Sequence, residues 1–138
     1  MLPTSVQLRF LCLDESLVAS ACRLSTQAGW NQTEEDWRRL IRLPGSCVRV
    51  WTDEQEVRVS YSIVSYGSQV AWIGMLLVDE AYRGRGLGKA GFSAALLDAA
   101  DFPLVGLDAT DLGEPIYLRK GFKTICPIVR WTGIPHAL

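Results

Sequence analysis

Residues 70–100, VAWIGMLLVDEAYRGRGLGKAGFSAALLDAA, decide the fold of this chain. The first part is a short, continuous apolar run that ends at Val78, and such a run predicts a strand covered on both faces. The last part, from Lys89 onward, is rich in alanine and leucine and predicts a helix. Between them lies a glycine-rich turn, residues 83–88. The stretch therefore predicts a buried strand that leads through this turn into a helix N-terminus.

The glycine-rich turn has the composition of an anion site. Gly84, Gly86 and Gly88 carry no Cβ atom, which lets successive backbone N–H groups turn toward one point. The first N–H groups of the following helix have no partner inside the helix and carry partial positive charge. Arg83 and Arg85 add formal positive charge. The turn therefore predicts a site for a phosphate or a pyrophosphate.

The sequence of this turn has three other interpretations. It can be a plain connection between a strand and a helix, because glycines commonly mark turns. Residues 86–91 also match the dinucleotide pattern G-x-G-x-x-G, with Asp108 near the spacing of a ribose contact. That pattern normally follows the first strand of a repeated βαβ unit, whereas half of this chain precedes it. A nucleoside-triphosphate loop requires Ser or Thr where this chain has Ala90.

The strand and turn resemble the acetyl-coenzyme A (acetyl-CoA) loop of the GNAT superfamily of N-acetyltransferases. The pattern Arg83-x-x-Gly86-x-Gly88 after Val78 carries this resemblance. It implies that the turn holds the pyrophosphate of acetyl-CoA and that the preceding strand offers backbone groups to the pantetheine arm, including a donor near Leu77 or Val78 for the developing oxyanion. The cofactor-binding residues implied here are Leu76, Leu77, Val78, Arg83, Gly84, Arg85, Gly86, Leu87, Gly88 and Lys89.

A second segment supports the same family. Residues 107–110, Tyr117 and the pair Gly121-Phe122 resemble the family's later strand and helix. The resemblance implies that Tyr117 is catalytic and protonates the leaving thiolate, although a tyrosine packed under the last helix is the alternative. It also implies that Thr110 and Gly113 bind the cofactor. Thr110 stands where many members have asparagine and Gly113 where many have alanine, so a side-chain hydrogen bond to the cofactor is left open.

The resemblance also implies where the acceptor amine binds. In GNAT proteins the connection between the first two helices forms part of the acceptor wall, which suggests Trp30, Asn31 and Glu34, while core packing and helix capping are the competing interpretations. Residues 70–73 carry no acid where some members have a general base. The substrate-binding candidates are Trp30, Asn31, Glu34, Trp72 and Asp108, and the candidate bases are Asp108, Asp111, Glu114 and Glu34.

The resemblance and the apolar periodicity together predict an α/β protein with a single-domain GNAT-like fold over residues 1–138. We expect a mixed central sheet of about six to seven strands flanked by about four helices. Trp51, Tyr61 and Trp72 are expected to contribute to an aromatic cluster. Beyond the strand that ends at Val78, strands are expected at 5–12, 47–52, 57–66, 104–109 and 122–131. Helices are expected from Asp14 or Ser16 to Gly29, from Thr33 to Arg42, after the glycine-rich turn, and before Gly121.

The composition of the chain argues against several classes of binding partner. The net charge of −1 argues against a nucleic acid held by bulk electrostatics, and no apolar run approaches the length of a membrane span. The first ten residues do not read as a secretory signal. The four cysteines, Cys12, Cys22, Cys47 and Cys126, are scattered, which argues against a zinc site and for buried thiols in a reducing cytoplasm. No metal is expected, and a homodimer through exposed strand edges is plausible.

The expected function follows from the resemblance. An enzyme of this family transfers the acetyl group of acetyl-CoA to a primary amine of a small molecule or peptide, by direct attack in a ternary complex. The alternative is a GNAT-fold module that binds coenzyme A (CoA) or a protein without efficient transfer, because no general base is evident. The sequence does not identify the acceptor, because acceptor walls are built from variable loops.

Overall fold

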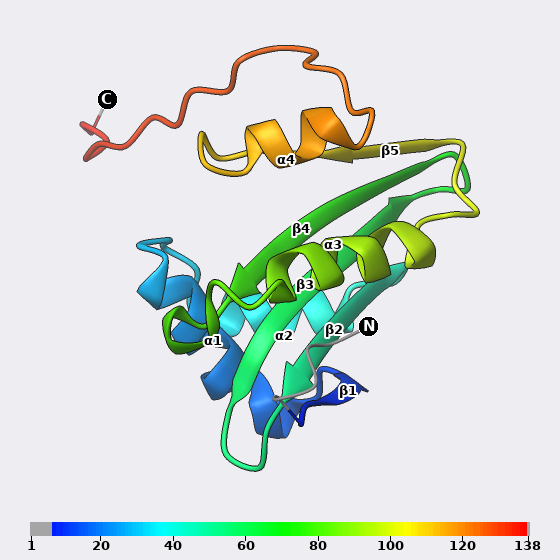
Figure 1. Cartoon of the computed structure of the whole chain (residues 1–138). Coiled ribbons are helices and arrows are strands. Elements are labelled where there is room, and N and C mark those ends of the chain that lie inside the picture. The colour runs from blue at the N-terminus through cyan, green and yellow to red at the C-terminus, as the bar shows by residue number, and fades with distance from the viewer. Residues whose placement is uncertain (1–6, 138) are drawn as a thin grey trace. The chain divides into compact units, whose positions relative to one another are not determined.

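The computed structural model describes residues 7–137, which fall into two units, one ending at Leu107 and one beginning at Asp108. The first unit contains a sheet, three α-helices and two short 3₁₀ turns, and the second contains one short helix (Figure 1). The expectation of a single domain over 1–138 stays a prediction. The strands are β1 (Arg9–Cys12), β2 (Ser46–Thr52), β3 (Val57–Tyr66), β4 (Val70–Val78) and β5 (Leu104–Leu107); the helices are α1 (Val18–Gln27), α2 (Glu34–Arg42), α3 (Leu87–Asp98) and α4 (Glu114–Arg119).

The sheet is mixed, as predicted. Its strands follow the chain order β1-β2-β3-β4-β5, with antiparallel pairs from β1 to β4 and a parallel pair between β4 and β5. A parallel pair needs a crossover connection, which α3 supplies between β4 and β5. The described helices number four, which also agrees with the prediction.

The expected strand at 122–131 is wrong, and the described sheet has five strands rather than six to seven. This segment has no regular secondary structure and joins no ladder among the described residues, and its Ile125 and Trp131 side chains are both 89% exposed. Pro127 cannot donate a ladder hydrogen bond, which weakens any strand it interrupts. The expected strand at 104–109 likewise ends at Leu107, and part of the expected first strand, residues 5–6, lies outside the described residues.

Helices cover the sheet of the first unit on both faces. Helix α3 packs on β3 and β4, and in Figure 1 it lies in front of them, with α2 behind. The other face packs against α1 and α2 around the fully buried Trp37, whose indole N–H donates to Ser25 Oγ at 3.1 Å. Gly91 brings α3 close to the sheet, since a Cβ there would lie 3.2 Å from side chains of Leu76 and Val59. Helix–sheet packing thus explains the third glycine of the apparent dinucleotide pattern.

The predicted start of α2 is confirmed. Thr33 caps the helix by accepting from the N–H of Asp36, and Asp36 accepts from the N–H of Thr33 at 2.8 Å. These reciprocal bonds form a capping box. The N–H and the hydroxyl of Thr33 both donate to the Asp36 carboxylate, and these bonds lower the pKa of Asp36 below its ordinary value. Asp36 is therefore a capping residue. Helix α1 ends before Gly29, whose φ of 74° fits the predicted stop.

Two side-chain expectations need correction. The aromatic cluster contains Phe10, Trp51 and Tyr61, with ring centroids 4.4 Å apart for the first pair and 5.9 Å for the second. Trp72 is not part of it, because it pairs with Val64 and so points to the face opposite Tyr61. The cysteines are free, but none is fully buried: Cys12 and Cys126 are exposed, and Cys22 and Cys47 are half-buried. Cys12 lies on the edge strand β1, where its side chain has less cover.

Candidate functional site

The glycine-rich turn opens α3 as the sequence predicts. Gly84 and Gly86 have φ angles of 76° and 77°, in the left-handed region that favours glycine, and a Cβ at either position would meet nothing within 4 Å. Gly86 is the N-cap of α3 and supplies no side-chain cap, and the first helical bond runs from Ala90 N–H to Gly86 O at 3.0 Å. The N–H groups of Leu87, Gly88 and Lys89 therefore have no partner inside the helix.

The cations of this turn are unneutralised. Arg83, Arg85 and Lys89 are exposed, and no carboxylate among residues 7–137 lies within ion-pair distance of them. The two arginines make long contacts to backbone carbonyls, at 3.3 Å for Arg83 and 3.4 Å for Arg85, and Arg85 also lies over the ring of Tyr82. Uncapped helix N–H groups beside guanidinium groups without a carboxylate partner fit a pyrophosphate, so the residues present suit the anionic part of acetyl-CoA.

Strand β4 carries a bulge that the sequence did not predict. Ser60 pairs with Leu77 and Ser62 with Gly74, so the single residue between them on β3 faces two residues, Met75 and Leu76, on β4. Met75 has a φ of 50°, which is uncommon for a residue other than glycine. The hydroxyl of Ser60 donates to the Met75 carbonyl oxygen at 2.7 Å and thereby satisfies one backbone group at the bulge.

Beyond the bulge, β4 has one open side. Its parallel pairing with β5 ends at Ile73, opposite Leu107. Residues 74–78 therefore have no strand on the β5 side within the described structure. Two side chains of this part of β4 pack inside the protein: Leu77 is buried in the core cluster with α1 and α2, and Leu76 lies against α3. Backbone groups therefore remain as the contribution that this part of β4 could make to a ligand, and the predicted role of Leu76, Leu77 and Val78 in binding one stays a prediction.

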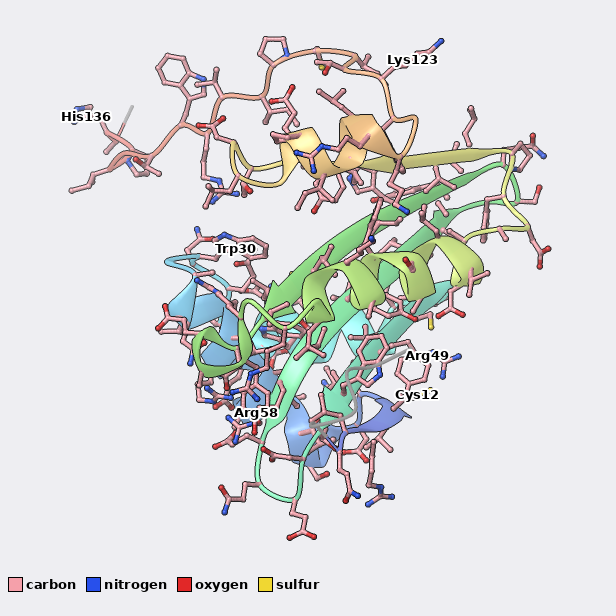
Figure 2. All side chains as sticks on the ribbon, viewed as in Figure 1. Cys12, Trp30, Arg49, Arg58, Lys123 and His136 are labelled. Carbon is pink, nitrogen blue, oxygen red and sulfur yellow. The ribbon has the colours of Figure 1, made fainter. Side chains whose placement is uncertain are left out.

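The connection between α1 and α2 carries three of the substrate-binding candidates. Trp30 is half-buried against the core cluster, so part of its ring belongs to the core (Figure 2 labels it). Asn31 is exposed, and the carboxylate of Glu34 is paired with Arg38 at 2.8 Å. Sequence reasoning missed Gln32, whose Oε1 atom is buried without a hydrogen-bond partner within the described structure. This oxygen is an acceptor for an N–H group.

The second unit holds Tyr117 on α4. A Cβ at Gly113 would lie 2.9 Å from the Tyr117 ring, so glycine there makes room for the phenol. Phe122 lies edge-on to the same ring, with centroids 6.4 Å apart, and burial raises the pKa of Tyr117 above its ordinary value. Thr110 Oγ1 accepts from the N–H of Gly113 at 3.2 Å and so stabilises the turn before α4, while Asp108 is exposed.

The candidate residues thus form two groups. The proposed cofactor residues from Leu76 to Lys89 belong to the first unit, and so do the acceptor candidates Trp30, Asn31, Glu34 and Trp72. Thr110, Gly113 and Tyr117 lie together in the second unit. The bulge and its Ser60 bond were missed because residues distant in sequence create them, and no local signal marks them.

No three side chains of His, Cys, Asp or Glu among residues 7–137 lie close enough to hold a metal ion. None of the helices in the same part of the chain combines the length and apolarity needed to cross a lipid bilayer.

Comparison with known sequences gives one family. A model of the acetyltransferase (GNAT) family matches residues 16–110 of the chain. A Bacillus subtilis protein named as an uncharacterized N-acetyltransferase, YitH, is 28% identical over 112 residues, which make up 81% of this chain and 39% of that protein. The chain therefore spans about two fifths of the length of this relative.

Comparison with solved structures gives the same fold. A Trypanosoma brucei acetyltransferase is 23% identical with a TM-score of 0.74, over 91% of this chain and 99% of that one. A glucosamine-6-phosphate N-acetyltransferase from Arabidopsis thaliana is 16% identical with a TM-score of 0.70, over 92% of this chain and 99% of that one. At these identities the likeness shows the fold alone.

Proposed function

Because the chain belongs to the acetyltransferase (GNAT) family, a family of acyltransferases, we propose that it transfers the acetyl group of acetyl-CoA to a primary amine of a small molecule or peptide. GNAT acetyltransferases use acetyl-CoA as the acetyl donor. The name of the Bacillus relative specifies N-acetylation, which supports a nitrogen acceptor. The observation that carries the proposal is the uncapped start of α3, with its left-handed glycines and unneutralised arginines, directly after β4.

Different residues of the chain are proposed to bind different parts of acetyl-CoA. The N–H groups of Leu87, Gly88 and Lys89 are proposed to bind the pyrophosphate, with Arg83 and Arg85 adding charge. Backbone groups of residues 74–78, on the open side of β4, are proposed to bind the pantetheine arm. This assignment uses backbone atoms where the side chains are already packed.

The chemistry needs little more than positioning and two polar groups. When bound, acetyl-CoA supplies a thioester carbonyl that a neutral amine can attack. Holding both substrates in attack geometry lowers much of the barrier. A backbone N–H near Leu77 or Val78 is proposed to stabilise the oxyanion. Tyr117 is proposed to donate a proton to the leaving sulfur, and its raised pKa keeps the phenol protonated at neutral pH.

The first test is donor binding. Isothermal titration of the protein with acetyl-CoA should give a micromolar Kd, and NAD should give no heat of binding. Gly86→Asp should abolish binding, because it adds a carboxylate and its side chain to the anion site. Gly67→Asp is the matched control, since Gly67 lies in the β3–β4 turn with a φ of 66° and equally open space. Equal Kd values for the two variants would overturn the assignment.

The second test separates an enzyme from a binding module. A panel of amines, assayed for CoA release, should contain an acceptor that is acetylated. Tyr117→Phe should then lower kcat about 100-fold and leave the Kd of acetyl-CoA nearly unchanged, because only the proton donor is lost. Tyr66→Phe, at an exposed tyrosine of β3, is the control. Binding of acetyl-CoA without turnover on any amine would favour the module.

A further inference from the structure

Tyr82 lies beside two arginines at the entrance to the glycine-rich turn. The turn follows the short 3₁₀ segment Glu80–Tyr82. The guanidinium carbon of Arg58, on β3, lies 4.7 Å from the centroid of the Tyr82 ring, and that of Arg85, within the turn, lies 4.9 Å from it. Both distances fall within the range of a cation–π contact. One aromatic ring therefore contacts both a strand residue and a turn residue.

The side chain of Arg58 is held in place by two carboxylates. Its Nε donates to Asp53 Oδ2 and its Nη1 to Asp79 Oδ2, both at 2.7 Å. Asp79 is 2% exposed and also accepts from Arg23 Nη2 at 2.8 Å. The charge of Arg58 is thus neutralised by two carboxylates, and Figure 2 labels the residue in this crowded part of the first unit. Arg58 is consequently an anchor, and its charge is not free for an anion.

Tyr82 is held at a second place, its hydroxyl. The hydroxyl donates to Asp53 Oδ2 at 3.0 Å. Asp53 itself accepts from the backbone N–H groups of Gln55 and Glu56, both at 2.8 Å. The ring of Tyr82 is therefore fixed through its hydroxyl as well as through its contact with Arg58.

Arg85 is held only weakly by comparison. Its ring contact with Tyr82 is joined by one long contact, from Nη2 to the Ala81 carbonyl at 3.4 Å, and its side chain is exposed. A free arginine side chain samples many rotamers, and stacking on an aromatic face restricts them. Stacking uses the flat face of the guanidinium and leaves N–H donors at its edge for an anion.

We propose that Tyr82 is a positioning residue that holds Arg85 ready for the anionic part of CoA, with Arg58 as the anchor of the ring. This proposal rests on the proposed function, since it assumes that the turn binds CoA. Tyr82 lies outside the Arg83-x-x-Gly86-x-Gly88 pattern, so the pattern alone does not reveal this role.

The experiment is isothermal titration with CoA, which reads binding without turnover. Tyr82→Leu should raise the Kd about fivefold, a size that fits one cation–π contact. Tyr82→Phe keeps the ring and should change the Kd less than twofold. Tyr66→Leu, the same change at an exposed tyrosine far from the turn in sequence, should leave the Kd unchanged. Thermal unfolding of each variant identifies a temperature at which all are folded.

A double-variant cycle distinguishes positioning from a general structural role. Arg85→Gln should weaken binding, and adding Tyr82→Leu to it should cause no further loss, because the residue that Tyr82 positions is gone. An equal loss from Tyr82→Leu with and without Arg85, or no loss at all, would overturn the positioning role. A wild-type protein that binds no CoA would overturn the proposed function together with this inference, whereas normal wild-type binding with an unaffected Tyr82→Leu overturns the inference alone.

Discussion

The two halves of strand β4 are held in different ways. Residues 70–73 pair on both sides, with β3 in antiparallel register and with β5 in parallel register. Residues 74–78 pair only with β3, and the bulge at Met75 interrupts even that pairing. The first half is thus held by backbone pairing on both sides, whereas the second half has a partner strand on one side only.

Side chains from β3 and α1 also bind the second half of β4 and the residue that follows it. Ser60 binds the carbonyl of Met75 within the bulge, and Asp79, directly after Val78, is held by Arg23 and Arg58. We infer that a strand paired on one side can keep one conformation when polar side chains bind it at its bulge and directly after its last residue. Four changes test this difference between the two halves.

The largest effect is expected from Asp79→Asn. It removes a buried carboxylate and leaves Arg23 and Arg58 partly uncompensated, although Arg58 keeps its bond to Asp53. We expect a loss of about 3 kcal/mol in the free energy of unfolding, at the low end for breaking a buried ion pair. Urea unfolding at pH 7 measures it, and the Kd of CoA should also rise because the turn follows Asp79.

Glu80→Gln is the matched control for Asp79→Asn. Glu80 is the next residue, it is exposed, and no ion pair involves it within the described structure. Its free energy of unfolding should change by less than about 0.5 kcal/mol. If both variants unfold alike, side chains do not hold the second half of β4.

A smaller effect is expected in the first half from Gly106→Ala. A Cβ at Gly106, on β5, would lie 2.6 Å from Cε3 of Trp72, so the indole or the strand must shift. We expect a loss of about 2 kcal/mol from overpacking, with an unchanged Kd for CoA because the second half stays intact. Gly133→Ala, at a glycine with open space, should be neutral. A clear rise in Kd for Gly106→Ala would mean that the two halves are coupled.

Most of this architecture could be predicted from sequence because its signals are local. The apolar run before the glycine-rich turn predicts β4 and α3, Thr33 with Asp36 predicts the start of α2, and Pro115 fits the first turn of α4. Each of these signals depends on residues within one or two turns of chain. The interpretation of the glycine-rich turn as an anion site also rests on a local signal. This turn is the best-defined part of the candidate site.

The remaining features depend on register and on distant partners. The pairing of Trp72 with Val64 sets the face of its side chain, and one bulge is enough to change which residues face which helix. The Asp79 site needs Arg23 from α1 and Arg58 from β3, and nothing near Asp79 in the sequence indicates either. The prediction of a strand at 122–131 was wrong for a related reason, because a strand needs a partner that its own sequence does not supply.

The third change is a fall in pH. Burial alone would raise the pKa of Asp79, but hydrogen bonds from Arg58 and Arg23 outweigh it and lower the pKa to about 2 from the ordinary 3.8. A lowered folded-state pKa stabilises the protein above the unfolded-state value, and this contribution is lost as the pH falls from about 5 toward 2. The loss should be about 2 kcal/mol and should be absent from Asp79→Asn. Equal acid sensitivity of both proteins in urea unfolding would assign the loss to other groups.

The smallest effect on stability is expected from Ser60→Ala. It removes the hydroxyl that donates to the Met75 carbonyl and should cost about 1 kcal/mol in the free energy of unfolding. The matched control is Ser62→Ala, also buried on β3 and on the same face, whose hydroxyl lies beside Gly74 instead. If the bulge shapes the open backbone of β4, Ser60→Ala raises the Kd of CoA more than Ser62→Ala does. Equal Kd values would mean that backbone geometry alone maintains the bulge, and the open half would then need no side-chain support at its centre.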